Sequence, residues 1–449
     1  MEQNIIKKEV IGFEMNFTVG PQFKYYSLKN YLEIPQMEKL TDEQKFDIEV
    51  VGQVLPFKAN NYVVDELINW DDAPNDPIYA LTFPQKGMLK PEYFDRISAL
   101  LKSGASRSEI KSAADSIRLE LSPHPAGQLK YNRPSVKGEP LKGAQHKYTE
   151  TVLFFPSQGQ TCHAYCTYCF RWAQFTGMSD LKIAMKEIEP LIEYIRQRPH
   201  ITDILFTGGD PMFMPVKFLK LYIEALLDAD LPHLQNIRIG TKALAYWPYR
   251  FLTDEDSQEV LDLFKKVNDS GKHLALMAHF THIREMQTDA VKEAILRIRE
   301  TGAQIRTQSP VIAHVNDDPK VWADMWREQV RLGCVPYYFF VARNTGAQHF
   351  FGVTLEKAWE IFQKAYQDVS GLGRTVRGPV MSAYPGKVRV LGVNEIAGEK
   401  VFVLESLQNR NDDKVLRPFF AKYNPDALWF TDLEPYSESD KIYFDVIKL

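Results

Sequence analysis

The chain has 449 residues, of which 45% are hydrophobic and 25% charged, and its formal net charge is −4 at pH 7. This composition suits a globular protein, long enough for one large α/β domain with additions or for two or three smaller domains. It carries no basic excess that would suggest nucleic acid, and no run of about 18 apolar residues that would suggest a membrane span. Its first residues, MEQNIIKKEVIGFEMNF, show no apolar segment of signal-peptide length, so we expect a cytoplasmic protein.

Residues 1–147 predict a mostly helical extension that ends in a linker. Residues 89–104 and 106–121 have apolar side chains at helical spacing. Residues 124–147 are rich in Pro, Gly and Lys and predict a linker or a covering loop.

Residues 148–370 alternate between short β-rich segments and amphipathic segments with helical periodicity. Thr253 and Thr288 precede acidic residues and predict helix starts, while Gly271 and Gly302 predict helix ends. Such βα pairs predict a parallel sheet that lies open or curls toward a barrel, with chemistry at the carboxyl ends of its strands. The six predicted strands are 151–156, 202–208, 236–241, 273–279, 303–309 and 335–342.

Residues 371–449 have a different sequence pattern from the preceding segment. The segment RTVRGPVMSAYPGKVRVLGVNEIAGEKVFVLES is β-rich with turns and predicts a hairpin-like closing element. An aromatic tail follows, and we expect it to pack on the main body: Phe419, Phe420, Tyr423, Trp429 and Phe430.

Three of the four cysteines, Cys162, Cys166 and Cys169, stand within eight residues directly after the first predicted strand. Three interpretations compete for this C-x3-C-x2-C spacing. Buried structural thiols explain a loop cluster poorly. A zinc site would normally need a second cysteine pair, which the chain lacks. A [4Fe–4S] cluster held by three thiolates, with one iron open to a small molecule, accounts for the missing fourth cysteine.

The motif TCHAYCTYCFRW, followed after the second strand by LFTGGDP, resembles the radical S-adenosylmethionine (SAM) superfamily. The resemblance implies an α/β fold, a partial (β/α)6 TIM-type barrel. It implies that Cys162, Cys166 and Cys169 bind the [4Fe–4S] cluster and that SAM is cleaved to a 5′-deoxyadenosyl radical. The residues it places at SAM are Tyr168, Gly208, Gly209 and Asp210.

The resemblance narrows to the lysine 2,3-aminomutase family, through RIGTKA, MAHFTH, TQSPVIAHVND and RGPVMSAYPGKVRVLG in the family's order. It implies a radical enzyme that depends on pyridoxal 5′-phosphate (PLP) and moves an amino group from Cα to Cβ. Lys387 would bind PLP, and Arg171 would hold the substrate α-carboxylate. Further contacts to PLP or SAM are expected from Lys147, Tyr148, His279 and Gln308.

The expected substrate is an amino acid other than lysine. Lysine-specific members hold the distal ammonium with two acidic residues, and the corresponding positions here fall at Ala342-Arg343-Asn344 and at Ser382. An ammonium buried beside Arg343 without a carboxylate would be strongly unfavourable. Glutamate, or another amino acid with a carboxylate or polar side chain, fits better, with Arg343 and Ser382 at the substrate.

The resemblance also implies an electron donor of the flavodoxin or ferredoxin type and allows a homo-oligomer. Two alternatives stay open at this point. One is a PLP-independent radical SAM enzyme of the same fold that acts on another amine or on a peptide. The other is a binding protein stabilised by zinc.

Overall fold

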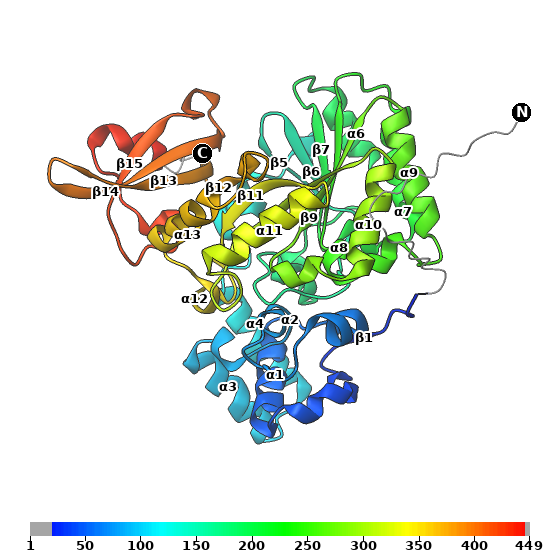
Figure 1. Ribbon diagram of the computed structural model, residues 1–449, viewed down its shortest axis with the longest axis vertical. Coiled ribbons are helices and arrows are strands. Elements are labelled where there is room, and N and C mark those ends of the chain that lie inside the picture. Colours follow the sequence, from blue (N-terminus) through cyan, green and yellow to red (C-terminus); the bar gives the residue numbers. More distant parts are fainter. Residues whose placement is uncertain (1–19, 445–449) are drawn as a thin grey trace, which may run out of the picture.

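The computed structural model describes residues 20–444, and its central feature is one eleven-stranded sheet (Figure 1). The strands lie in chain order across this sheet, from β5 at one edge to β15 at the other. They are β5 Ala144–Tyr148, β6 Thr151–Phe154, β7 Asp203–Phe206, β8 Asn236–Thr241, β9 His273–His279, β10 Gln304–Val311, β11 Val335–Val341, β12 Arg377–Ser382, β13 Gly386–Ile396, β14 Glu399–Asn409 and β15 Pro418–Lys422.

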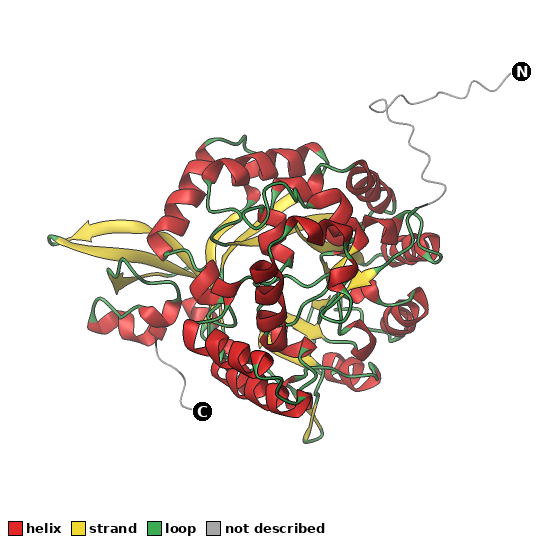
Figure 2. Cartoon of the chain, turned by 90° about the horizontal axis from the view of Figure 1, so that it is seen from below, coloured by secondary structure: helices red, strands yellow, loops and turns green. Residues whose placement is uncertain are grey.

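The six predicted strands are confirmed as β6 to β11, and they run parallel. Strand β12 adds a seventh parallel member, while β5 pairs antiparallel with β6. Because β5 and β15 form the two edges, the described strands make an open, partial barrel. Figure 2 shows the helices arranged around the outside of this curved sheet. They are α6 Glu189–Arg196, α7 Val216–Asp228, α8 Ala243–Tyr246, α9 Ser257–Asp269, α10 Asp289–Glu300, α11 Pro319–Arg331, α12 Gln348–Phe351 and α13 Leu355–Gln367.

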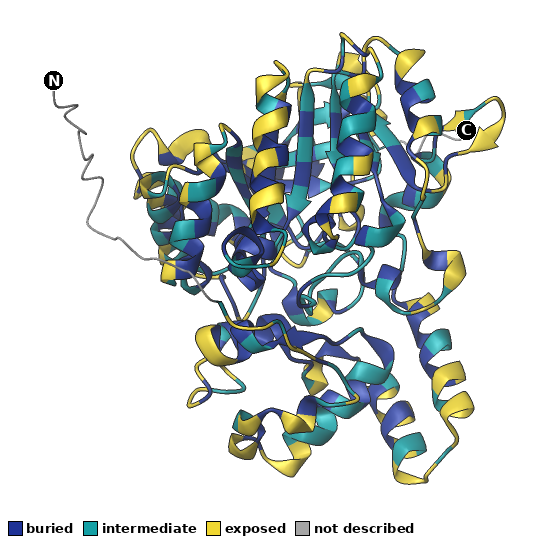
Figure 3. Ribbon diagram, turned by 90° about the vertical axis from the view of Figure 1, so that its right-hand side faces the viewer, coloured by how far each residue is buried: buried dark blue, intermediate teal, exposed yellow. Residues whose placement is uncertain are grey.

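Alternating burial along the strands explains how the sheet packs. In β8 and β10 every second residue is buried, as expected for strands covered by helices on one face. The apolar stripes of the helices cover that face, and Figure 3 shows exposed residues gathered on the outward sides of the helices.

The predicted helix ends are mostly confirmed. The Thr288 side chain accepts a hydrogen bond from the Val291 amide at the start of α10, and Gly271 and Gly302 have φ of +83° and +85° after α9 and α10. The prediction for Thr253 is wrong, because α9 begins only at Ser257. The preceding acidic residues are used elsewhere, since Asp256 pairs with Arg250 and Asp254 accepts from Trp247.

The N-terminal part contains the predicted helices. Residues 89–104 and 106–121 correspond to α3 Pro91–Lys102 and α4 Arg107–Glu120, beside α1 Asp42–Val54, α2 Pro77–Thr82 and α5 Gln128–Tyr131. Short strands also pair here, β1 Tyr25–Tyr26 with β2 Ala59–Asn60 and β3 Ser135–Val136 with β4 Glu139–Pro140. The predicted loop 124–147 is more ordered than expected, because β5 at its end completes the hydrogen bonding of β6.

The β-rich C-terminal segment is confirmed as β12 to β15, in which the β13–β14 hairpin projects from the body (Figure 1). The aromatic tail packs as expected, since Phe419, Trp429 and Phe430 share a buried cluster with Val388 of β13. The division into residues 1–147, 148–370 and 371–449 remains a prediction, since one sheet runs across both boundaries. Within residues 20–444, no helix has the length and apolar character that crossing a membrane requires.

Candidate active site

The three clustered cysteines lie in the loop after β6, at the carboxyl ends of the parallel strands. None forms a disulfide. Burial raises the pKa of the Cys162, Cys166 and Cys169 thiols, that of Cys169 to about 12. Three cysteines in one loop, none of them in a disulfide, are the donor set that an iron–sulfur cluster requires, so the loop fits a [4Fe–4S] group with one iron left without a protein thiolate.

The arrangement of the thiols bears on the zinc alternative. In the part of the chain that the structure describes, no three His, Cys, Asp or Glu side chains are placed to hold a single metal ion. A zinc site of the usual kind would also need a second cysteine pair, which the chain lacks.

The glycine-rich motif after β7 packs against the cysteine loop. The Asp210 amide donates to the carbonyl oxygens of Gly159 at 3.1 Å and Thr161 at 2.7 Å. A Cβ atom on Gly209 would lie 2.5 Å from the Thr161 nitrogen and 2.7 Å from its carbonyl carbon. Only glycine at 209 lets the two backbones approach this closely.

Asp210 holds the ends of two neighbouring strands together. Its carboxylate is 2% exposed and accepts from Thr241 Oγ1 at 2.7 Å, the Lys242 amide at 2.8 Å and the Met212 amide at 2.9 Å. Burial raises the pKa of this carboxyl group. The structure thus gives Asp210 a bracing role, and its contact with SAM stays a prediction, as do those of Gly208 and Gly209.

Replacing Gly209 by alanine (G209A) is expected to displace the cysteine loop and reduce iron binding after reconstitution to less than about half. The added methyl group would overlap backbone atoms of Thr161, which cannot rotate away. Iron analysis of the purified protein measures the effect. Gly371→Ala is the matched control, because a Cβ atom there meets nothing within 4 Å. Full iron binding by G209A would contradict this packing.

The N-terminal part forms a second wall of the cysteine loop. The Tyr165 amide donates to the Lys58 carbonyl at 2.7 Å, and the Thr167 amide to the Leu81 carbonyl at 2.9 Å. The buried Asn60 amide group donates to the His163 carbonyl at 3.2 Å. Sequence reasoning missed these residues, because no motif marks them and the contacts join segments about a hundred residues apart.

Side chains from the ends of β9 and β10 meet beside this loop. The Tyr168 hydroxyl hydrogen-bonds to Thr281 Oγ1 at 2.9 Å, and Gln308 Nε2 lies 2.8 Å from His279 Nε2. Burial lowers the pKa of His279 to about 3, which keeps its imidazole neutral. The predicted residues Tyr168, His279 and Gln308 thus lie near the carboxyl end of β9, and their contacts with SAM or PLP remain predictions.

Two arginines flank one aromatic ring near the loop. The guanidinium carbon of Arg171 lies 4.5 Å from the ring centre of Phe155 and 4.9 Å from that of Phe170. The guanidinium carbon of Arg343 lies 4.6 Å from the ring centre of the same Phe170. Burial and mutual repulsion lower the pKa of Arg171 to about 9, while burial lowers that of Arg343 to about 10. Arg171 Nη1 is buried without a hydrogen-bond partner. Such a group is open to an anion.

Arg343 and Ser382, predicted to face the substrate, touch each other. Arg343 Nη2 donates to the Ser382 carbonyl oxygen at 3.2 Å. Burial raises the pKa of Tyr148, and the nearby Ser382 side chain opposes that rise. The ends of β5, β11 and β12 therefore meet at this point of the fold.

Lys387 is the second residue of β13 and lies in an aromatic setting. Its ammonium nitrogen is 2.6 Å from Gln408 Oε1, 4.7 Å from the ring centre of Tyr338 and 5.0 Å from that of Tyr148. Burial lowers the pKa of Lys387 to about 8, so a sizeable fraction of the amine is neutral near physiological pH. Gln408 was missed in the sequence, because only its pairing with Lys387 across β13 and β14 reveals it.

Other charged groups lie near Lys387, since Arg238 and Arg377 lower its pKa and Asp203 raises it. Lys147 donates to the Ala383 carbonyl, and burial lowers its pKa well below the usual value, with Arg343, Arg410 and Lys387 adding repulsion. Arg410, which sequence reasoning missed, donates to the Tyr384 carbonyl at 3.1 Å. Among residues 20–444, Arg171, Arg343, Lys147 and Lys387 form no ion pair with a carboxylate.

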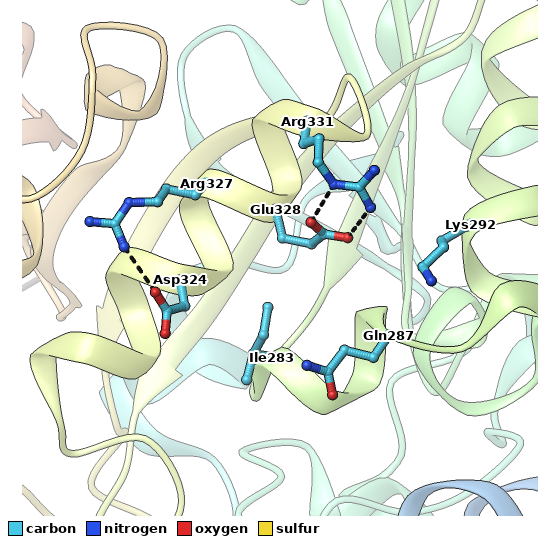
Figure 4. Close-up of a pocket in the computed structure, with 7 residues that line it drawn as sticks. All are labelled: Ile283, Gln287, Lys292, Asp324, Arg327, Glu328 and Arg331. Carbon is cyan, nitrogen blue, oxygen red and sulfur yellow. Dashed lines mark hydrogen bonds and ion pairs between the residues drawn. The ribbon is translucent and has the colours of Figure 1, made fainter. Parts of the chain in front are cut away.

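A surface pocket lies apart from these residues, between α11 and the segment that leads into α10 (Figure 4). Its charged side chains largely satisfy one another, since Asp324 pairs with Arg327 at 2.8 Å and Glu328 with Arg331 at 2.5 Å. No predicted site residue lines it. We therefore place the candidate active site at the cysteine loop and the cationic residues near Lys387.

Comparison with solved structures gives only a weak likeness. A radical SAM methyltransferase from Sphaerobacter thermophilus has a TM-score of 0.38 and 14% identity, covering 65% of this chain and 94% of that chain. A likeness of this size does not identify a fold. No protein-family model matches the chain.

Comparison with curated proteins gives clear relatives. The chain is 29% identical to the L-lysine 2,3-aminomutase of Bacillus subtilis (strain 168) over 52% of this chain and 46% of that protein. It is 26% identical to the glutamate 2,3-aminomutase of Clostridioides difficile (strain 630) over 47% of each chain. A protein of Aquifex aeolicus (strain VF5) named "Putative L-lysine 2,3-aminomutase" is 31% identical over 90% of this chain and 95% of its own length. The chain therefore belongs to the lysine 2,3-aminomutase family of radical SAM enzymes.

Proposed function

We propose that this enzyme is a PLP-dependent 2,3-aminomutase that moves the amino group of an acidic amino acid from Cα to Cβ. The observation that carries the proposal is a group of four partly buried cations, Arg171, Arg343, Lys147 and Lys387, none of which forms an ion pair with a carboxylate among the described residues. Buried charges in proteins are normally paired. The missing anions would come from the ligands: two carboxylates of the substrate and the phosphate of PLP.

The surroundings of Lys387 fit PLP. A partly buried lysine whose pKa is lowered to about 8 suits attachment to an aldehyde cofactor, and Gln408 holds its amine in one orientation. Lys147 and Arg410 lie within electrostatic reach and would bind the cofactor phosphate. When bound, PLP supplies a conjugated system that stabilises a substrate radical next to the migrating nitrogen.

Arg171 would bind the substrate α-carboxylate. Its unpaired Nη1 atom is available for this, and its position two residues after Cys169 joins the cluster loop to the substrate. Stacking on Phe155 and Phe170 fixes the plane of the guanidinium, which suits a bidentate contact. The radical would then form near a substrate whose Cβ is held in place.

Arg343 would bind the distal carboxylate. The Ser382 carbonyl and the Phe170 ring hold its guanidinium, leaving other N–H groups for a ligand. A lysine ammonium at this point would face a cation in a buried setting and be repelled. The relative that acts on glutamate shows that the family includes an enzyme for an acidic amino acid. The electron would come from a small flavodoxin- or ferredoxin-type donor.

Replacing Arg343 by methionine (R343M) is expected to lower kcat/KM for glutamate by at least about 30-fold. Loss of one partner of a buried charge pair costs about 2–5 kcal/mol, and each 1.4 kcal/mol is tenfold. The measurement is β-amino acid formation by the reconstituted enzyme, followed by mass spectrometry. Arg331→Met, at an exposed arginine paired with Glu328, is the control. Unchanged glutamate turnover in R343M would remove Arg343 from the substrate site.

A further inference from the structure

Lys58 is a buried cation beside the cysteine loop. It is 8% exposed and stands directly before β2 in the N-terminal part of the chain. Its ammonium nitrogen donates to the Cys162 carbonyl oxygen at 2.6 Å and lies 3.4 Å from Thr161 Oγ1. Within the described residues it forms no ion pair with a carboxylate, so its charge is directed at the loop.

Four aromatic rings surround this ammonium. The ring centres of Phe213, Tyr25, Tyr165 and Phe23 lie 4.4, 5.3, 5.8 and 5.9 Å from the nitrogen. Aromatic faces attract a cation while excluding water from it. The rings come from the N-terminal strand pair, from the cysteine loop and from the segment after β7, so the cage forms only in the folded protein.

We infer that Lys58 is a positioning residue that sets the reduction potential of the cluster at Cys162. The carbonyl that it binds and the thiol that would hold iron belong to one residue, which brings the ammonium within direct electrostatic range of the cluster. Adding an electron makes the cluster more negative, so a fixed cation with little water around it stabilises the reduced form. Asp210, whose charge also acts on Cys162, is already satisfied by Thr241, Lys242 and Met212.

The test is a redox titration of the full chain, reconstituted with iron and sulfide and followed by electron paramagnetic resonance. No SAM, PLP or amino acid is present, so failure here is separate from failure of the proposed function. Lys58→Met (K58M) is expected to reduce the ratio of reduced to oxidised cluster at a fixed potential about tenfold, which is about 59 mV for one electron. Lys58→Arg is expected to keep the wild-type value.

Lys272→Met is the matched control, because Lys272 also donates to backbone carbonyls, those of Leu231 and Leu234, away from the loop. If K58M fails to load iron, Phe213→Leu takes its place, since loss of the nearest ring admits water that screens the charge. A potential shifted to more negative values in the variant used, with K272M unchanged, supports the inference. A potential equal to wild type overturns it.

Discussion

Replacing Cys162 by alanine (C162A) is expected to abolish both the iron–sulfur cluster and SAM cleavage. With three cysteines there is no spare protein ligand, because the fourth cysteine of the chain, Cys334, is buried at the start of β11. A two-thiolate site would leave the cluster exposed to loss of iron. Iron analysis and 5′-deoxyadenosine formation after reduction with dithionite measure the two effects, and both should fall to background.

Cys334→Ala is the matched control for this variant. Cys334 is 4% exposed, and burial raises the pKa of its thiol to about 12, which makes it an inert core residue. C334A is expected to keep about four iron atoms per chain and full SAM cleavage. SAM cleavage at the wild-type rate by C162A would show that these cysteines do not carry the radical chemistry.

Replacing Lys387 by alanine (K387A) is expected to abolish PLP attachment and amino-group migration. Lys387 is a partly buried lysine whose amine is hydrogen-bonded to Gln408 and lies near the rings of Tyr148 and Tyr338. Borohydride reduction in the presence of PLP, followed by peptide mapping, should label Lys387 in the wild type and leave K387A unlabelled. SAM cleavage at the cluster should persist, because the cysteine loop is untouched.

The pH dependence of labelling provides a second readout. Burial lowers the pKa of Lys387 to about 8, and only the neutral amine attacks the aldehyde. The labelling rate should therefore rise with pH up to about 8 and then level off, whereas an ordinary lysine would continue to rise to about pH 10. Lys364→Ala, at an exposed lysine near the end of α13, is the control and should label normally. A wild-type enzyme without label at Lys387 would favour the PLP-independent alternative.

The central part of the fold could be predicted because its signals are local. Each of β6 to β11 is a short β-rich segment followed by an amphipathic helix. The spacing of apolar residues along the sequence is enough to identify such elements. The position of Cys162 to Cys169 after β6 follows from the same pattern. The start of α9 was misplaced because Asp254 and Asp256 pair with Trp247 and Arg250 rather than capping a helix at Thr253.

The site was predicted less completely, because much of it depends on contacts between distant segments. Lys58 and Asn60 reach the cysteine loop from about a hundred residues away, and Gln408 meets Lys387 only through the pairing of β13 with β14. The motif predicts that Asp210 contacts SAM, which stays a prediction, but it did not reveal that the Asp210 carboxylate accepts hydrogen bonds from Thr241 and two backbone amides. Residue types and motifs indicate the kind of reaction, but tertiary contacts determine which side-chain atoms are left without a partner in the protein.

The most direct measurement is an assay of the reconstituted wild-type enzyme against the common amino acids under anaerobic conditions. SAM, PLP and dithionite are supplied, and β-amino acid products are identified by mass spectrometry. The cationic residues around Arg171 and Arg343 predict that glutamate or another amino acid with a carboxylate side chain gives a β-amino acid, while lysine gives little. Turnover of lysine alone, or SAM cleavage without any β-amino acid, would contradict the proposed function.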